Sequence, residues 1–293
     1  MSNLRDQMKK NMELRGFSPK TQYAYLNHIR HFQDFFEQPL ESMGTNEIRD
    51  FLHYCITKKK VSRSYVNTTY STLRFMYETT LGRHWDIKQI PRVKRDKRLP
   101  VALAQDEVQR LFAVTTNLKH KAMLMIAYDA GLRVSEVANL KISDIDSANM
   151  QIIIRLAKGR VDRYSLLSQT VLKILREYYL KHQPKLWLFP GAIPDKPIHT
   201  RSIQRVFEEA RDKAGITKKA SVHSLRHSFA THLLEEGINI VYIQKLLGHA
   251  NITTTLRYLH LVQVKIVKVP SPLELFSKEE KSNDSNDRNP RGI

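Results

Sequence analysis

Apolar residues recur at three- and four-residue steps through the first part of the chain, with polar residues between them. The clearest run follows Ser18-Pro19, where a serine able to cap a helix precedes a proline in the first helical position. Further runs begin at Gly44-Thr45 and at Ser62, and the last one extends to Gly82. The pattern predicts a small bundle of short antiparallel helices over residues 1–90. The apolar face of the first of these helices is expected to carry Tyr23, Leu26, Ile29, Phe32, Phe35 and Phe36.

The helical pattern stops between Ile90 and Pro100, in a stretch that is bounded by prolines and rich in lysine and arginine. Few of its residues are suited to a core, so residues 91–104 are predicted to be a basic linker between two domains. A linker of this composition can lie along a phosphate backbone. A solvated connector without a partner fits the same residues.

A second domain is predicted over residues 105–265, and it contains a short β section among its helices. Residues 150–156 and 161–167 are rich in β-branched side chains and flank a Lys158-Gly159 turn, which predicts a hairpin. Helices are expected to resume at Ser168 and again near Arg201. The expected fold class is therefore mainly α with a small β-sheet.

The end of this domain and the tail follow a different pattern. Residues 221–259 predict three helical pieces, separated by Gly237 and Gly248 at positions suited to helix C-caps. Residues 266–293 are predicted to form a C-terminal segment and tail, which is polar from residue 277 onward and is expected to be disordered.

The charge balance favours a polyanionic partner. The chain has 293 residues and carries 48 lysines and arginines against 29 aspartates and glutamates, a formal net charge of +19. The excess is spread over both predicted domains, and the tail is nearly neutral. Neutralising phosphates releases condensed counterions and strengthens binding, so nucleic acid is the expected partner. A basic surface kept for solubility would give the same composition.

Cysteine usage and hydropathy exclude several classes of protein. The only cysteine, Cys55, lies in an apolar helical run, so no internal disulfide is expected and the side chain is predicted to pack. No spacing of cysteine and histidine resembles a zinc site. The first residues lack an apolar signal region and no stretch is long enough to span a membrane, so we expect a cytoplasmic protein.

Two histidines and an arginine lie together in His223-Ser224-Leu225-Arg226-His227. On a helix His223 and Arg226 share one face, so both side chains can address one phosphate. Arginine offers a planar fork for two phosphate oxygens, and neutral histidine can donate a hydrogen bond or accept a proton. Taken alone, an ordinary surface pair of histidine and arginine explains the same residues.

Other candidate residues lie on either side of this block. In Gly131-Leu132-Arg133 an arginine follows a predicted helix end, and Glu136 can hold its guanidinium in place, although an ordinary helix ion pair has the same spacing. Lys158 at the hairpin tip would by default be a solvated turn lysine. Leu247-Gly248-His249 is followed nine residues later by Tyr258.

Together these residues have the order and spacing found in tyrosine recombinases, the phage-integrase family, which the chain resembles over about residues 1–265. The resemblance is carried by Gly-Leu-Arg-x-Ser-Glu, His-x-Leu-Arg-His-x-Phe-Ala-Thr-His and Leu-Leu-Gly-His, and it is nearest to Xer-type and transposon-associated integrases. It implies an N-terminal SAM-like helical core-binding domain, a linker, and an α+β catalytic domain. The departures are small: Ala157 precedes the hairpin lysine, Tyr164-Ser165-Leu166 forms the return strand, and Ala104 stands where a capping Ser or Thr is common.

The resemblance also assigns roles to residues. Arg133 and Arg226 would clamp the non-bridging oxygens of the scissile phosphate. His249 would donate a further hydrogen bond to that phosphate, and Lys158 would be the general acid for the leaving 5′ oxygen. Tyr258 would be the nucleophile, with His223 the nearest candidate base. The implied catalytic set is Arg133, Lys158, His223, Arg226, His249 and Tyr258, with Glu136 in support.

Tyr258 is preferred over the other tyrosines because only it has the required distance from His249. Tyr242 is expected to pack within its helix, and His227 and His232 are expected to pack or to support theirs. The product would be a 3′-phosphotyrosine with a free 5′-hydroxyl. Because the ester keeps the bond energy, resealing needs neither ATP nor Mg²⁺, and no cofactor or metal is expected.

The implied partners are double-stranded DNA and further copies of the chain, as a tetramer on two paired sites. An accessory DNA-bending protein or a partner recombinase is left open, and no membrane partner is expected. Residues 262–276 are the candidate for a segment passed to a neighbouring protomer. The target sequence and the biological outcome do not follow from the sequence.

Three other functions fit part of the sequence. A type IB topoisomerase shares the chemistry, but the Xer-like N-terminal domain argues against it. A non-catalytic DNA-binding protein on the same fold is opposed by the complete set of reactive residues. A metal-dependent nuclease using the histidines is opposed by the lack of a carboxylate between His223 and His227, unlike a zincin helix.

Overall fold

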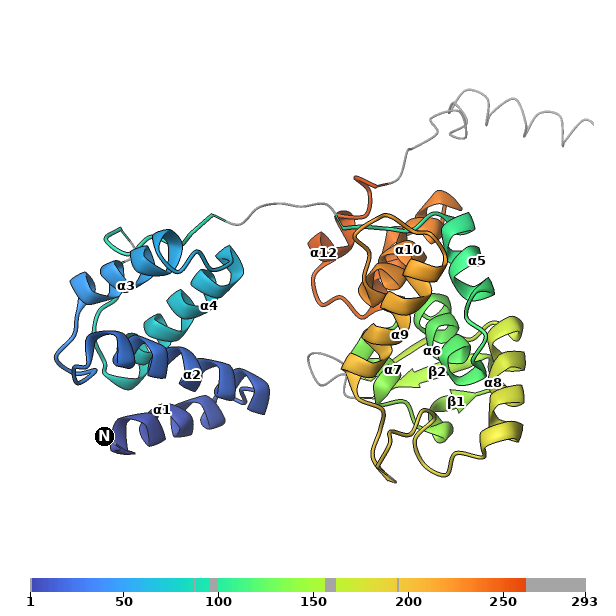
Figure 1. Ribbon diagram of the computed structural model, residues 1–293, viewed down its shortest axis with the longest axis horizontal. Coiled ribbons are helices and arrows are strands. Elements are labelled where there is room, and N and C mark those ends of the chain that lie inside the picture. The colour runs from blue at the N-terminus through green and yellow to red at the C-terminus, as the bar shows by residue number, and fades with distance from the viewer. Residues whose placement is uncertain (1, 87, 95–99, 156–161, 194, 262–293) are drawn as a thin grey trace, which may run out of the picture. The chain divides into compact units, whose positions relative to one another are not determined.

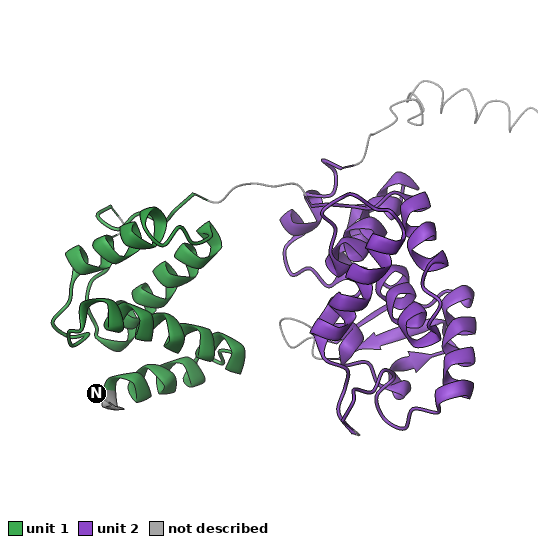
Figure 2. Cartoon of the chain, in the orientation of Figure 1, with its two compact units in different colours: residues 1–98 green, residues 99–293 purple. Residues whose placement is uncertain are grey.

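The computed structural model describes residues 2–86, 88–94, 100–155, 162–193 and 195–261 (Figure 1). The chain divides into two compact units, Met1–Arg98 and Leu99–Ile293 (Figure 2). Each unit has its own buried apolar core. Within the described ranges the architecture is mainly helical with one small sheet, which confirms the predicted fold class.

Unit 1 is helical throughout its regular structure, as the apolar periodicity predicts. Ser18 caps the second helix by accepting a hydrogen bond from the Thr21 N–H, and Ser62 caps the fourth by accepting from Tyr65 N–H. The helix at the N-terminus lies within the region predicted to be helical, although no separate helix before Ser18 was predicted. The elements are α1 (Ser2–Leu14), α2 (Pro19–Phe36), α3 (Thr45–Thr57) and α4 (Arg63–Arg74), the last running into a π-helical turn, η1 (Phe75–Thr80).

The core of unit 1 is rich in aromatic rings and methionine. Phe32 of α2 meets Phe51 of α3 edge to face, with ring centroids 5.2 Å apart, and Cys55 is fully buried beside them as predicted. Of the predicted α2 face, Tyr23 lies outside this core and is 76% exposed, and Phe35 lies at its edge, 41% exposed and in ring contact with Phe51. The apolar face of α2 is therefore narrower than the sequence pattern indicates.

The described ends of the predicted linker are packed rather than free. Ile90 is buried, and Val93 packs against the core of unit 1 and accepts a hydrogen bond from the Asn67 side chain through its carbonyl. At the other end Leu103 is buried in unit 2, where its N–H donates to Ser228 Oγ at 2.7 Å. Residues 95–99 lie outside the described ranges.

Unit 2 surrounds a small sheet and a buried helix, α6, which packs against α8, α9 and α10. Its apolar residues face in nearly every direction around the helix, so α6 forms the centre of the core. The elements are α5 (Gln105–Ala113), α6 (Leu118–Asp129), α7 (Val134–Ala138), a 3-10 turn η2 (Ile142–Asp144), β1 (Ile145–Asp146), β2 (Gln151–Ile154), β3 (Arg163–Leu166), α8 (Gln169–His182), α9 (Thr200–Lys213), α10 (Val222–Glu235), α11 (Ile240–Leu247) and α12 (Ile252–Leu256).

The sheet is antiparallel in the order β1-β2-β3. The predicted hairpin strands are present as β2 and β3, with Ile152 opposite Ser165 and Ile154 opposite Arg163. β1 was not predicted, since two residues are too few to give an alternating pattern. Along β3, Arg163 and Ser165 are buried while the residues after each are exposed, so this strand turns an arginine toward the interior.

Candidate active site

Arg226 occupies the middle of α10 and is among the largest fully buried side chains of the described residues. Its guanidinium donates to the Gly131 carbonyl at 2.7 Å and to the Leu247 carbonyl at 2.6 Å. The Leu247 carbonyl is the last of α11, and Gly131 lies just after the C-terminal end of α6, so both contacts are at helix ends where the helix dipole favours a cation. Burial lowers the pKa of Arg226 to about 10, helped by the charge of Arg133. The side chain therefore remains a cation at neutral pH.

Glu136 lies in the first turn of α7 with its carboxylate among three guanidinium groups. It accepts the Arg133 backbone N–H at 2.8 Å, which caps the helix, and the Arg133 Nη1 at 2.6 Å. Arg163 donates to both carboxylate oxygens at 2.8 Å, and Arg226 Nη1 is 3.8 Å away. Burial favours a higher pKa for Glu136, but the bonds and charge of Arg163 and Arg133 outweigh it and hold the pKa at about 2.

His249 is placed by the turn that ends α11. Gly248 adopts φ 62°, in the left-handed region that suits glycine as a helix C-cap. The His249 ring lies with Nε2 3.1 Å from Arg226 Nη2 and Nδ1 2.9 Å from Thr255 Oγ1. Burial and then the charges of Arg226 and Arg133 lower the pKa of His249 to about 4. The ring is therefore neutral near pH 7.

The partners of His249 fix its tautomer. A guanidinium has only donors, so Nε2 must accept from Arg226 and the proton must sit on Nδ1. Donation from Nε2 to a phosphate, the role implied by the family resemblance, requires this hydrogen bond to break and a proton to be placed on Nε2, by a change of tautomer or by protonation of the ring.

Tyr258 lies in the turn that follows α12 and is only 3% exposed. Its hydroxyl is 3.0 Å from Nδ1 of His227, and its ring lies nearly parallel to that of His249, 6.3 Å between centroids. Burial raises the pKa of Tyr258, and the nearby charge of Arg226 opposes the shift. The hydroxyl is thus a neutral phenol close to a cationic cluster.

His223 and His227 lie one turn apart on α10 with their rings edge to face, 4.8 Å between centroids. His223 is exposed and His227 is half-buried. Burial and then the neighbouring His223 and Arg226 lower the pKa of His227 to about 3, so this ring is neutral. Of the two, it is His227 that is hydrogen-bonded to the Tyr258 hydroxyl.

A sequence model described as the phage integrase family matches residues 102–264, more than half of the chain, and one described as the N-terminal SAM-like domain of phage integrases matches residues 4–87. The chain belongs to the phage integrase family. The resemblance inferred from the sequence blocks is thereby confirmed, and the enzyme is a tyrosine recombinase.

Relatives of this phage integrase family member span nearly its whole length. The protein y4qK of Sinorhizobium fredii, described as an integrase/recombinase, is 38% identical over 279 residues, which cover 95% of this chain and 91% of the relative. Tyrosine recombinase XerA of Pyrococcus horikoshii is 32% identical over 263 residues, which cover 88% of each chain.

Solved structures share the fold of this recombinase. The crystal structure of XerA recombinase is 29% identical, with a TM-score of 0.52, and the match covers 89% of this chain and 94% of that one. The XerH recombinase bound to its difH substrate in a post-cleavage complex has a TM-score of 0.71 at 19% identity, covering 92% of this chain and 85% of that one. At that identity the likeness is one of fold.

The predicted site residues of the recombinase fall into three groups. Arg133, Glu136, Arg226, His249 and Tyr258 lie in one connected cluster built from α7, α10, α11 and the turn after α12. His223 is linked to this cluster through ring contacts: its ring contacts the ring of His227, which in turn contacts Tyr258. Lys158 lies outside the described residues, as does the segment 262–276.

Sequence reasoning did not identify His227 or Arg163 as part of this cluster. His227 was expected to support its helix, as His232 does by bonding the Tyr128 hydroxyl at 2.8 Å. Its adjacency to Arg226 in the family block was the available signal. For Arg163 the signal was weaker. The alternation of buried and exposed positions along its strand places this arginine at an inward position, where a charged residue is unusual. The expectation that Tyr242 packs was wrong, because it is 63% exposed on α11.

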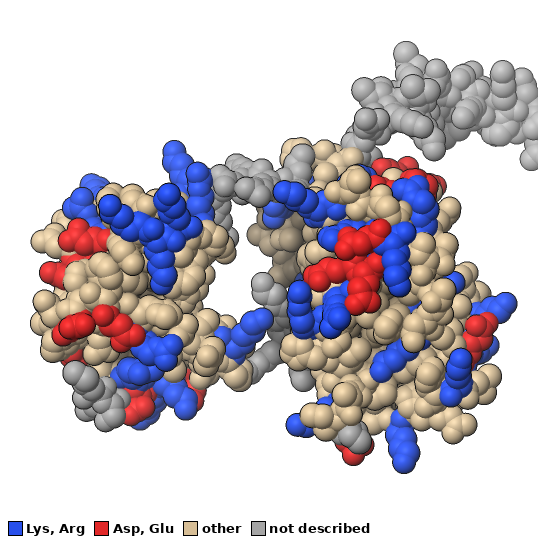
Figure 3. Space-filling model, in the orientation of Figure 1, with Lys and Arg blue, Asp and Glu red and all other residues tan. Residues whose placement is uncertain are grey.

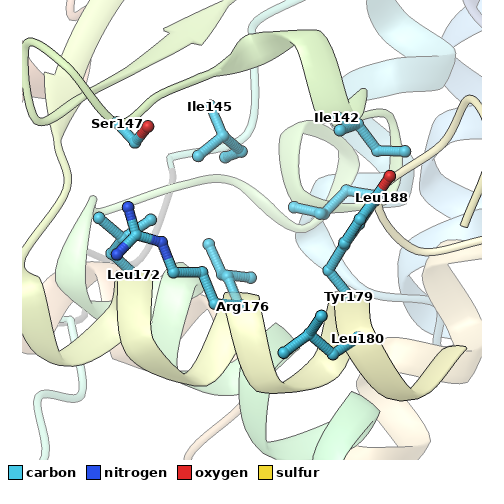
Figure 4. Close-up of a pocket in the computed structure, with 9 residues that line it drawn as sticks. Ile142, Ile145, Ser147, Leu172, Arg176, Tyr179, Leu180 and Leu188 are labelled. Carbon is cyan, nitrogen blue, oxygen red and sulfur yellow. The ribbon is translucent and has the colours of Figure 1, made fainter. Parts of the chain in front are cut away.

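The described residues of the recombinase contain no group of three or more His, Cys, Asp or Glu side chains able to hold a metal ion. Over the same residues no helix is long and apolar enough to cross a bilayer. An apolar pocket of about 380 Å³ lies elsewhere, between α8 and the segment that carries η2 and β1, and its lining includes Leu172 and Tyr179 on one side and Ile142 and Ile145 on the other (Figure 4). No predicted site residue lines it.

Proposed function

We propose that this tyrosine recombinase breaks and rejoins DNA at specific sites through a 3′-phosphotyrosine bond formed by Tyr258. The proposal rests on one observation above the rest: the Tyr258 hydroxyl is held beside the buried cation Arg226 and the ring of His249. A phenol beside fixed cations has the parts needed to displace an alcohol from a phosphodiester.

The main barrier to the reaction is the negative charge that builds on the phosphate, and the cations would stabilise that charge. Arg226 is held by two carbonyls and Arg133 by Glu136, so neither has to reorganise when charge develops. Arg133 keeps 21% of its side chain exposed and is the group that would meet the DNA first. His249 would add a hydrogen bond once its own bond to Arg226 is broken and its Nε2 carries a proton.

The proton transfers complete the reaction. The bond from phosphorus to the 5′ oxygen breaks as the tyrosyl ester forms, and Lys158 would protonate the leaving oxygen. The Tyr258 proton would pass to a histidine of α10. The sequence favours His223 for this role, and His227 is the ring in hydrogen-bond contact. Reversal on a different strand would reseal the DNA without ATP, because the ester conserves the energy of the broken bond.

Tyr258 must leave its buried position to reach a DNA phosphate. The turn that carries it follows a helix of five residues, and short local hydrogen bonds to Thr255 and Leu261 hold it there. Such a turn can rearrange at low cost compared with the helices around it. Cleavage is therefore expected only when DNA occupies the cationic cluster.

Double-stranded DNA is the proposed substrate. The net charge of +19 favours it, and basic side chains lie on the drawn face of both units (Figure 3). Residues 1–90 would be the core-binding domain, 91–104 a basic linker and 105–265 the catalytic domain. Both XerH and lambda integrase were solved bound to DNA, the latter as a tetramer on a Holliday junction. We extend DNA binding and a tetramer on paired sites to this chain.

The test is covalent capture of DNA by the full-length protein. The protein would be expressed in cells, trapped under denaturing conditions, and the attached DNA sequenced; a nicked duplex of that sequence then serves as the substrate. Tyr258→Phe should bind this duplex as the wild type does and form no adduct. Tyr242→Phe, at an exposed tyrosine of α11, should form the adduct normally.

The proposal fails if Tyr258→Phe still forms the adduct, or if the wild-type adduct requires a divalent metal and disappears in EDTA. Relaxation of supercoiled plasmids that lack the captured sequence, without recombination between two copies of it, would instead favour a type IB topoisomerase.

A further inference from the structure

Arg163 is a buried cation next to the proposed site, and neither the sequence blocks nor the proposed mechanism gives it a role. Its side chain is 8% exposed. It projects from the inward face of β3, opposite Ile154, and reaches both α7 and the C-terminal end of α11. It therefore connects the two elements that carry Arg133 and His249.

The first connection concerns the charge of Glu136. Arg163 donates to both carboxylate oxygens at 2.8 Å, whereas Arg133 makes one side-chain bond and Arg226 stays 3.8 Å away. A buried carboxylate must be paired. Without Arg163 the carboxylate would keep only its bonds from the Arg133 backbone N–H and Nη1, so Arg133 and Arg226 would have to balance its charge, and either guanidinium would then be partly neutralised.

The second connection concerns the turn that places His249. Arg163 Nε donates to the Leu246 carbonyl at 3.0 Å, next to the Leu247 carbonyl that accepts from Arg226. A Cβ on Gly248 would lie 2.6 Å from Arg163 Cδ. The glycine is thus needed both for its left-handed backbone and for the close passage of this side chain, and the two arginines together cap the last turn of α11.

We infer that Arg163 is a positioning residue for strand cleavage. By occupying Glu136 it leaves Arg133 and Arg226 available to the scissile phosphate, and by holding the Leu246 carbonyl it fixes the turn that presents His249. Arg163 itself does not touch the DNA in this role. The inference rests on the proposed roles of Arg133 and Arg226.

The test compares two substrates that differ only in charge. One is the nicked duplex with a normal scissile phosphodiester, and the other carries a neutral methylphosphonate at the same position. Adduct formation would be followed in a single turnover for the full-length wild type, Arg163→Gln and Arg163→Lys. Arg205→Gln is the control, since Arg205 is an exposed α9 side chain paired only on the surface with Glu209.

Arg163→Gln should slow cleavage of the phosphodiester about 30-fold or more, the scale of losing part of a charge-stabilising contact. Cleavage of the methylphosphonate should fall about threefold or less, because a neutral centre has little need of the guanidinium charge. Arg163→Lys should lie between, since its single amine keeps the charge but cannot reach Glu136 and the Leu246 carbonyl together. DNA affinity should change little.

Equal losses on both substrates would show a general structural defect and overturn the inference, as would normal cleavage of the phosphodiester by Arg163→Gln. Arg133→Gln in the same assay separates this outcome from failure of the proposed function. If Arg133→Gln slows cleavage of the phosphodiester much more than that of the methylphosphonate and Arg163→Gln does not, only the role inferred for Arg163 is refuted. If Arg133→Gln cleaves both substrates normally, the proposed phosphate clamp of Arg133 and Arg226 is refuted as well.

Discussion

The Tyr258 hydroxyl lies 3.0 Å from Nδ1 of His227, on the turn of α10 after His223. Both histidine rings are in contact, and His227 stands between His223 and the phenol. The proton of Tyr258 thus meets His227 first, although the sequence block points to His223.

The first prediction distinguishes these histidines. His227→Gln should slow single-turnover cleavage near pH 7 by no more than about 100-fold, the low end of the range for a lost proton acceptor, because a ring with a pKa of about 3 is a weak base. Because burial holds the pKa of Tyr258 above its usual value of 10, the phenol stays protonated at neutral pH. The deficit should narrow toward pH 9 as hydroxide removes the proton directly. His223→Gln is the matched comparison. A larger, pH-dependent loss of cleavage rate in that variant would show that His223 is the proton acceptor for Tyr258.

The second prediction separates the two arginines of the proposed clamp. Arg133 is partly exposed, so Arg133→Gln should abolish most cleavage while leaving thermal stability and DNA affinity close to wild type. Arg226 is buried and holds two helix-end carbonyls, so Arg226→Gln should lose cleavage and also about 3 kcal/mol of stability. Thermal unfolding and gel-shift binding of both variants measure this split. Wild-type stability in Arg226→Gln would contradict the structural part.

The third prediction concerns the close passage of Arg163 beside Gly248. Gly248→Ala should destabilise the protein and slow cleavage, because the methyl group would clash with Arg163 at 2.6 Å. Gly215 is the matched control: it has φ +66°, against +62° at Gly248, and nothing within 4 Å of an added Cβ. Gly215→Ala should cost only the backbone strain, about 1 kcal/mol. Equal melting temperatures and equal cleavage rates in the two variants would argue against the clash.

The fourth prediction follows from the depressed pKa of Glu136, which is about 2 against an ordinary 4.5. A folded-state pKa below the unfolded value stabilises the fold above pH 4.5, and this contribution is lost as the pH falls from 4.5 toward 2. The contribution is on the order of 3 kcal/mol. The free-energy gap between wild type and Glu136→Gln should therefore be large near neutrality, fall to about a quarter of that value at pH 2.5, and vanish only below pH 2.

Tryptophan fluorescence can measure that gap in the full-length chain. The chain has two tryptophans: Trp85 is buried in unit 1, and Trp187 is half-buried in unit 2. In a Trp85→Phe background, the signal from Trp187 reports the unfolding of unit 2 alone. If the difference in unfolding free energy between wild type and Glu136→Gln stayed constant across the pH range, Glu136 would not contribute to the loss of stability in acid.

Much of the fold follows from local sequence signals. Capping residues such as Ser18 and the glycine at 248 mark helix ends through their own backbone geometry, and the β-branched run marks the hairpin. Short elements gave no such signal: β1 has two residues and pairs only because β2 lies beside it. The exposure of Tyr23 and Tyr242 also depends on which neighbouring elements cover a helix, and periodicity alone does not contain that information.

The site residues were predictable as types and spacings, but their connections were not. Nothing within the block around Arg226 shows that its guanidinium ties the ends of α6 and α11. The pairing of Arg163 with Glu136 joins residues 27 positions apart across separate elements. Such contacts arise from tertiary packing, which decides which of several nearby histidines and arginines meet.

One carboxylate among three guanidinium groups leaves the cluster with surplus positive charge. We therefore expect this cluster, before it meets nucleic acid, to attract small tetrahedral oxyanions. Inorganic phosphate or sulfate in a buffer would occupy it, protect the enzyme against heat and compete with the substrate. Turnover rates of this enzyme are therefore best compared in chloride or acetate solutions.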